Sequence, residues 1–177
     1  MNAKAVDGCK LFRDQLDCET FISLLRAEIA RSDWSCIAYS LMGTHYHVLL
    51  RLRKCTLSSG LQHLNSTYAR SFNRRYGRRG ALWQRRFHDV LIESDAHLYE
   101  VTRYIALNAP RANMCDAAEE HLWCSYGSAV GAFPPDPLVD ETELLGLFGT
   151  TVPQARRQLQ RFVEERDPRK RRSLTPL

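Results

Sequence analysis

Residues 41–50 read Leu-Met-Gly-Thr-His-Tyr-His-Val-Leu-Leu, and this stretch decides which fold the chain can adopt. Side chains alternate between the two faces of a β-strand, so His45 and His47 share one face while Tyr46 and Val48 share the other. The apolar face suits burial, and the other face carries two imidazoles whose Cα atoms are about 7 Å apart. Imidazole is the commonest side-chain metal ligand, so the strand can supply two ligands of an open site. The alternative to a metal site is that one histidine packs against the rest of the protein and the other is exposed to solvent.

The sequence on both sides of this strand predicts an α+β fold. Helices have apolar residues at spacings of three and four, strands show alternation, and Gly43 supplies a hairpin turn. The predicted elements are a helix at residues 15–32, strands at 34–41 and 44–52, a helix at 56–76, an extended segment at 81–92, a helix from Ser94 to about residue 111, and short helices at 140–148 and 152–165. A basic tail at 166–172 is predicted to be disordered. This order favours an antiparallel sheet with helices on one face.

The composition is typical of a globular protein, with 44% hydrophobic and 25% charged residues in a chain of 177. No stretch is apolar enough to cross a membrane, and residues 1–10 lack the apolar core of a signal peptide. The six cysteines include no Cys-x-x-Cys pair, so we expect reduced thiols. We therefore expect a cytoplasmic protein without a membrane partner.

Positive charge is concentrated in one part of the chain. Residues 34–88 contain no Asp or Glu but ten basic residues, whereas the rest of the chain holds 15 basic and 20 acidic residues. Nine of the ten are arginines, which favour bidentate contacts with phosphate. A basic surface of this kind is typical of proteins that bind a nucleic-acid backbone.

A second polar group lies on the helix predicted to begin at Ser94. Tyr104, Asn108 and Arg111 are spaced by four and three residues, so they share one helix face. A tyrosine oxygen can attack phosphorus as a nucleophile, and an amide oxygen is a hard ligand suited to Mg²⁺ or Mn²⁺. On an amphipathic helix, however, a tyrosine is more often a core or rim residue.

Two segments, taken together and in this order, resemble a known family. His45-Tyr46-His47 is similar to the HUH motif, in which U is a hydrophobic residue. Residues 103–112, Arg-Tyr-Ile-Ala-Leu-Asn-Ala-Pro-Arg-Ala, are similar to the signature rYIxxNPxRA, with Asn-Ala-Pro in place of Asn-Pro. Both belong to the IS200-like Y1 transposases, and the branch that the chain resembles most is the REP-associated tyrosine transposases. Agreement continues over residues 68–73, 80–87 and 123–126.

The resemblance implies a ferredoxin-like HUH endonuclease domain over residues 1–130 and a C-terminal helical extension over residues 131–177. It also implies a DNA transposase that acts on single-stranded or hairpin DNA as a monomer or homodimer, associated with the nucleoid. The residues expected to contact the DNA backbone are Arg70, Arg74, Arg75, Arg78, Arg79, Arg85, Arg86 and Arg111. Trp83 or Tyr76 could stack on a base, although Trp83 fits a core position equally well.

The family's site residues can be carried over to this chain. In the family, the two histidines and the helix Asn or Gln hold a divalent metal, here His45, His47 and Asn108 with Mg²⁺ or Mn²⁺. The helix tyrosine, here Tyr104, is the nucleophile that nicks and rejoins DNA through a 5′-phosphotyrosine. A phosphohydrolase with a longer histidine series is disfavoured, because position 49 is leucine.

One departure concerns the N-terminus. The family's domain usually opens with a strand of the type YHVxxRG, and residues 1–10 do not match it. We therefore expect the sheet to lack its first strand, either because the start is misplaced or because this copy has lost it. The alternative function is that of a catalytically inactive or domesticated protein that binds DNA hairpins.

Overall fold

The computed structural model describes residues 1–54 and 56–165, and the chain divides into two compact units. Unit 1 comprises residues 1–36 and 41–90, and unit 2 comprises residues 37–40 and the chain from residue 91 onward. The predicted basic tail at 166–172 lies outside the described residues.

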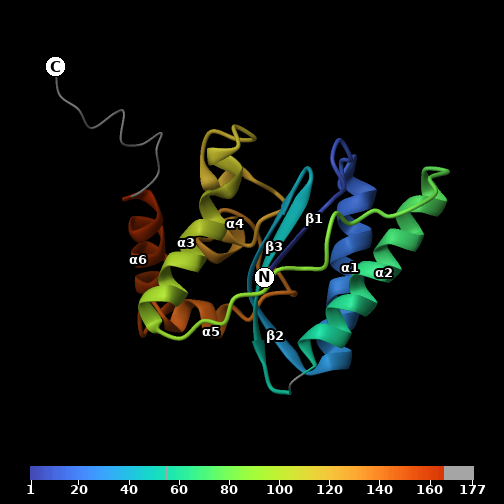
Figure 1. Cartoon of the computed structure of the whole chain (residues 1–177). Helices are drawn as coiled ribbons and strands as arrows, with labels where there is room; N and C mark the ends of the chain where they lie inside the picture. The colour runs from blue at the N-terminus through green and yellow to red at the C-terminus, as the bar shows by residue number, and fades with distance from the viewer. Residues whose placement is uncertain (55, 166–177) are drawn as a thin grey trace. The chain divides into compact units, whose positions relative to one another are not determined.

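Three strands form one sheet, in the order β1-β3-β2 (Figure 1). They are β1 (Asn2–Lys4), β2 (Trp34–Met42) and β3 (His45–Leu52). Only two residues, Gly43 and Thr44, connect β2 to β3, so the predicted hairpin is confirmed. β2 is buried along nearly its whole length, which is why it lacks the alternation of polar and apolar residues expected of a half-exposed strand.

The expectation that the N-terminal residues contribute no strand is wrong. β1 pairs antiparallel with β3, with Asn2 opposite His47 and Lys4 opposite His45. Asn2 of β1 also bridges to His88, and Ala5, which follows β1, bridges to Trp83, so part of the predicted extended segment at 81–92 is bound to this N-terminal stretch. Three residues are too few to show an alternating pattern, and Asn and Lys have low strand propensity, so the free edge of β3 decides the pairing.

Two helices cover the Tyr46 face of the sheet in unit 1, namely α1 (Gln15–Ser32) and α2 (Leu57–Arg75), which lie side by side in Figure 1. Tyr46 is fully buried, its ring centroid lies 4.6 Å from that of Phe21 in α1, and its hydroxyl donates to Asn65 Oδ1 of α2 at 2.8 Å. Both helices therefore pack on one face of the sheet, as the sequence predicts. α2 ends where Gly77 adopts a positive φ of 60°, which confirms the predicted stop.

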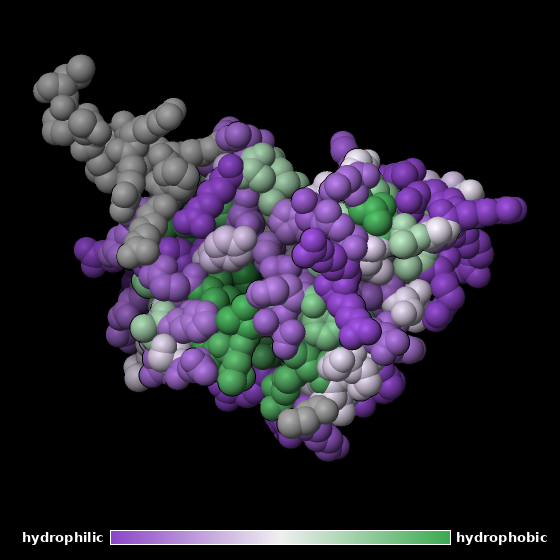
Figure 2. All heavy atoms as spheres, in the orientation of Figure 1, coloured by the Kyte–Doolittle hydropathy of each residue, from purple (hydrophilic) through white to green (hydrophobic). Residues whose placement is uncertain are grey.

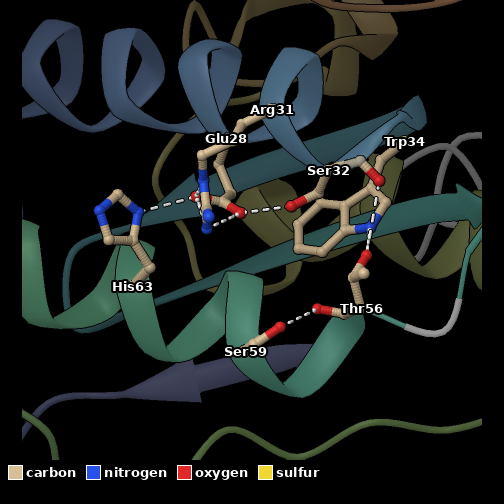
Figure 3. Close-up of polar contacts among 7 residues, drawn as sticks. All are labelled: Glu28, Arg31, Ser32, Trp34, Thr56, Ser59 and His63. Carbon is tan, nitrogen blue, oxygen red and sulfur yellow. Dashed lines mark hydrogen bonds and ion pairs between the residues drawn. The ribbon is translucent and has the colours of Figure 1, made fainter.

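A buried carboxylate joins α1 to α2 (Figure 3). Glu28 in α1 accepts hydrogen bonds from Arg31 and Ser32, and Nδ1 of His63 in α2 lies 2.8 Å from its Oε2. Burial alone raises the pKa of Glu28, but the hydrogen bonds outweigh it, and the pKa lies below that of a free glutamate. Gly60 permits this approach, since a Cβ there would lie 2.6 Å from Glu28 Oε1.

Unit 2 is built on a long helix, α3 (Asp95–Arg111), which begins with the predicted cap: Ser94 Oγ accepts from His97 N. The other elements are η1 (Ala118–Glu120), α4 (Tyr126–Ala129), α5 (Glu141–Gly146) and α6 (Val152–Glu164). Residues 37–40 join this unit through the backbone of Tyr39, whose N–H donates to Ser125 Oγ and whose carbonyl accepts from Ser125 N. α5 and α6 confirm the helices predicted near residues 140–148 and 152–165.

Two further expectations concern the surface and the cysteines. Figure 2 shows mostly hydrophilic residues over the region where Figure 1 draws α1 and α2. Within residues 1–54 and 56–165, none of the helices is long and apolar enough to cross a membrane. The five cysteines in that part of the chain are thiols, and four of them are buried.

Replacing Glu28 by Gln should lower the free energy of unfolding by about 2 kcal/mol at pH 7, because the amide has one acceptor oxygen instead of two and no negative charge to pair with Arg31. The folded pKa is depressed, so the carboxylate stabilises the protein fully above its unfolded pKa, about 4.3, and the effect is lost as the pH falls through the folded pKa. Urea denaturation at several pH values measures this difference.

Glu19→Gln is the matched control, because Glu19 lies on the same helix, is exposed and interacts with Gln15. Equal stability of the Glu28→Gln variant and the wild type at pH 7 would contradict the role given to Glu28.

Candidate functional site

The two histidines of β3 lie on one face of the sheet, as the sequence predicts. Their ring centroids are 4.9 Å apart and the rings are nearly perpendicular, at 88°. His47 is buried and His45 is half-buried, whereas Tyr46 between them points into the core of unit 1. The register with β1 places Asn2 opposite His47, so the edge strand flanks the pair.

Both imidazoles are neutral at neutral pH. Burial lowers the pKa of His45, and the nearby Lys4 ammonium lowers it further. Burial lowers the pKa of His47 to about 4, and the positive charges of the N-terminal amino group and of a protonated His45 act in the same direction. Only an imidazole without a proton on one nitrogen can bind a metal, so this environment keeps the pair in the ligating form.

The predicted nucleophile and amide ligand lie on α3 of unit 2. Tyr104 is 45% exposed, whereas Asn108, one turn later, is buried. Asn108 Nδ2 donates to the backbone carbonyl of Tyr104 at 3.0 Å, which orients the amide and leaves its oxygen as the atom for a cation. Arg111 is exposed in the last turn of the same helix. Tyr104 is therefore at the surface of its unit and not in the core.

Another side of α3, away from Tyr104, packs against α6 and against the residues that follow α5. The Tyr99 ring packs against Phe148 and Phe162, with centroid distances of 5.2 and 5.7 Å, and its hydroxyl donates to the Leu147 carbonyl. Arg103 is buried, and its guanidinium carbon lies 3.5 Å from the Phe162 ring centroid. The sequence analysis missed Arg103, although it precedes Tyr104 in the signature. Tyr99, the other tyrosine of this helix, is bound into the core of unit 2.

The residues predicted as metal ligands are divided between the units: His45 and His47 belong to unit 1, and Asn108 belongs to unit 2. Within the described residues, no three His, Cys, Asp or Glu side chains form a metal-binding group. Asparagine is not one of those four residue types, so this finding does not test the predicted set of two imidazoles and one amide. The joint ligand set remains a prediction.

The arginines expected to contact DNA have different surroundings. Arg75 is bound within unit 1 by Asp14 and Asp17, which hold its pKa above the usual range, so it connects α2 to the start of α1. Arg78 donates to Asn73 Oδ1 and lies beside the Phe72 ring. The others are exposed: Arg70, Arg74, Arg79, Arg85, Arg86 and Arg111.

Neither aromatic candidate for base stacking is arranged for that role. Trp83 Nε1 donates to the Asn65 carbonyl, and its ring lies beside those of Tyr46 and Tyr68. The Tyr76 hydroxyl donates to Asp17, and the Arg13 guanidinium lies 4.2 Å from its ring centroid. The core alternative considered for Trp83 is the one observed.

Comparison with known protein families shows which family contains these residues. The family model described as "Transposase IS200 like" matches residues 9–108, more than half of the chain. The chain belongs to the IS200-like transposase family. The match begins before α1 and includes the two histidines, Tyr104 and Asn108. No curated protein matches the chain.

The fold of this IS200-like transposase also matches a solved structure. The structure is that of a REP-associated tyrosine transposase bound to a REP hairpin, with a TM-score of 0.59 and 13% sequence identity. The match covers 77% of this chain and 80% of the solved chain. At this identity the likeness establishes the fold, which confirms the predicted fold class.

In this IS200-like transposase, His47 should remain neutral down to about pH 4, whereas an unfolded histidine takes up its proton near pH 6.5. Because the unfolded state then binds more protons, His47 should contribute stability above about pH 6.5 that is lost as the pH falls toward 4. NMR titration of the imidazole ring signals measures the pKa directly.

His63, which is exposed and faces Glu28, serves as the internal comparison in the same spectra. A His47 that titrates at or above pH 6.5 would show that the imidazole is not held neutral by burial.

Replacing Phe162 by Ala should lower the free energy of unfolding by about 2–3 kcal/mol, because it removes an aromatic partner of Tyr99 and the surface under Arg103. Hydrogen exchange should quicken at the α3 amides near these two residues. Arg157→Ala, an exposed change on the same helix, is the control. Unchanged exchange in α3 would mean that α6 does not support this helix.

Proposed function

We propose that this protein is a metal-dependent transposase that nicks and rejoins single-stranded DNA through Tyr104. The observation that carries the proposal is the pair of neutral imidazoles on β3 in a chain of the IS200-like transposase family. The lowered pKa of both histidines supports metal ligation, because neither proton has to be displaced at neutral pH. The exposure of Tyr104 supports its access to a DNA strand.

The residues present fit a small divalent cation such as Mg²⁺ or Mn²⁺. His45 and His47 would supply imidazole nitrogens, and Asn108 would supply its amide oxygen, leaving several positions for water and phosphate oxygens. A bound cation would act as a Lewis acid that neutralises charge developing on the scissile phosphate. All three protein ligands are neutral, so the full charge of the cation would remain available to the phosphate.

In the proposed reaction, the Tyr104 hydroxyl loses its proton and its oxygen forms a bond to the scissile phosphorus. The bond between that phosphorus and the 3′ oxygen breaks, and the departing oxygen takes up a proton. The products are a 5′-phosphotyrosine and a free 3′-OH, which can attack the phosphotyrosine of another strand in the reverse step. No water has to be activated, and the proton lost by the Tyr104 hydroxyl balances the one taken up by the departing 3′ oxygen.

The partner we propose is DNA with a hairpin next to a single strand. The REP-associated transposase that shares the fold was solved with a REP hairpin, which supports this choice. Exposed arginines that follow α2 in the chain, at positions 79, 85 and 86, would contact the backbone of the DNA.

We also propose that the chain consists of a catalytic domain over residues 1–130 and a C-terminal extension over residues 131–177. The family match ends at residue 108, and α5 and α6 lie beyond it. We further propose a location in the cytoplasm with the nucleoid, as a monomer or homodimer.

Tyr104→Phe should abolish nicking and covalent capture of DNA while leaving the fold intact, because it removes only the nucleophilic oxygen. The wild type and the variant are incubated with a labelled DNA hairpin that carries a single-stranded extension, with Mn²⁺. Denaturing gel electrophoresis then detects the covalent protein–DNA adduct, which should form with the wild type alone.

Tyr99→Phe is the matched control, since the Tyr99 hydroxyl is engaged with the Leu147 carbonyl, and it should still form the adduct. An adduct that persists with Tyr104→Phe would move the nucleophile elsewhere. Binding of the hairpin without any adduct in the wild type would favour the alternative of a catalytically inactive hairpin-binding protein.

A further inference from the structure

Lys4 lies on the same face of the sheet as the two histidines, within unit 1. β1 runs antiparallel to β3, with Lys4 directly opposite His45 and Asn2 directly opposite His47. Side chains of directly opposite residues project from the same face of an antiparallel pair, so Lys4 and Asn2 stand on the histidine face. Ala3, between them, projects from the other face and is buried, whereas Lys4 is exposed.

The hydrogen bonds between β1 and β3 make Lys4 and His45 a close pair. Met1 and Val48 exchange two hydrogen bonds, each of 3.1 Å, between backbone nitrogen and carbonyl oxygen. Hydrogen-bonded and non-hydrogen-bonded pairs alternate along an antiparallel ladder, so Lys4 and His45, three positions further along, form a non-hydrogen-bonded pair with Cα atoms about 4.5 Å apart. Burial lowers the pKa of the His45 imidazole, and the Lys4 ammonium is close enough to lower it further.

Two structural roles that an exposed lysine of a short strand often has do not account for Lys4. Lysines on edge strands oppose pairing with other chains. The outer edge of β1 is already paired, however, because Asn2 exchanges hydrogen bonds with His88 and the Lys4 carbonyl accepts one from Gln84 N. An ion pair can also hold such a side chain, but within residues 1–54 and 56–165 no carboxylate forms one with Lys4. Its charge therefore remains available beside His45.

We propose that Lys4 is a phosphate-binding residue of the nicking site, and that its ammonium group contacts a non-bridging oxygen of the phosphate held at the histidine pair. Lysine is a point charge with three donors on a flexible stem, so it can follow an oxygen that moves as the phosphate reacts. The inference rests on the proposed function, because this phosphate is the one that Tyr104 would attack.

A positive charge is what the histidine pair itself lacks. Both imidazoles are neutral at neutral pH, because burial lowers the pKa of each, so neither can offset the negative charge of a phosphate. A cation placed at the oxygens of a reacting phosphate accelerates the reaction when it interacts more strongly with the transition state than with the ground state. Lys4 would act in this way from β1, which flanks β3 on the side away from β2.

The test locates the phosphate that Lys4 contacts. Labelled DNA hairpins carry a single-stranded extension in which one phosphate at a time is replaced by an uncharged methylphosphonate. Their binding to the wild type and to Lys4→Met is measured by fluorescence anisotropy without divalent metal. With unmodified DNA, Lys4→Met should bind about 3- to 10-fold more weakly at about 0.1 M salt. At one position, which we expect to be the nicked phosphate, the methylphosphonate should abolish this difference, because both changes remove the same contact.

Lys10→Met is the matched control, since Lys10 is also an exposed lysine of unit 1 but lies outside the strands. This control should show no coupling to the phosphate that couples to Lys4. Lys4→Arg keeps the positive charge and should therefore restore most of the affinity that Lys4→Met loses. If Lys4→Met fails to fold, Lys4→Gln, which keeps a polar side chain at this exposed position, takes its place in the scan.

The proposal would be overturned if no single methylphosphonate abolished the difference, or if Lys10→Met coupled to the same phosphate. Coupling to a phosphate away from the nicked one and its immediate neighbours would also overturn it. Failure here is distinguishable from failure of the proposed function, because the scan uses binding alone. A wild type that forms no covalent adduct but couples Lys4 to one phosphate keeps the contact and removes the nuclease. An adduct without any coupling keeps the nuclease and removes the contact.

Discussion

The burial of Tyr46 is the constraint on which the arrangement of unit 1 depends. Its ring is enclosed by Phe21 and Trp83, and its hydroxyl is bound by Asn65. Since neighbouring side chains of a strand point to opposite faces, this one buried ring fixes both histidines on the other face. A slip of one residue would bury two imidazoles in the helix-packed core and expose a tyrosine. Packing on one face of β3 therefore determines the chemistry available on the other.

The elements with strong periodicity could be predicted from the sequence. The first helix was predicted at its observed bounds, and the β2–β3 hairpin and the Ser94 cap followed from turn and cap residues. β1 could not be predicted in this way, because Asn2–Lys4 is too short to carry a pattern and is ordered by the edge of β3. On α3, the polar residues Thr102 and Arg103 are buried whereas Leu98 and Val101 are only half-buried, an arrangement that the apolar pattern of the helix does not predict.

The run of basic residues in the sequence overestimates how much positive charge is available on the surface, because acidic side chains from distant segments form ion pairs with some of the arginines. Asp14 and Asp17, some sixty residues earlier in the chain, bind Arg75. Arg103 is buried against an aromatic ring from α6. Arg70 and Arg74 are exposed, and α2 itself contains no carboxylate that could pair with them. Arginine thus connects two helices in one place, is buried in a core in another and carries exposed positive charge in a third. The sequence alone does not distinguish these roles, because they depend on the fold.

The neutrality of the histidine pair bears on the metal site proposed above, which would contain no carboxylate. Burial opposes a proton on His47, and the N-terminal amino group beside it opposes the proton further. The same burial would oppose a divalent cation if nothing compensated its charge. A phosphate group of the DNA can supply that compensation, because it brings its own negative charge to the metal. The proposed site, with neutral ligands alone, should therefore hold a cation most firmly when the proposed DNA partner is present, so that metal and DNA binding would support each other.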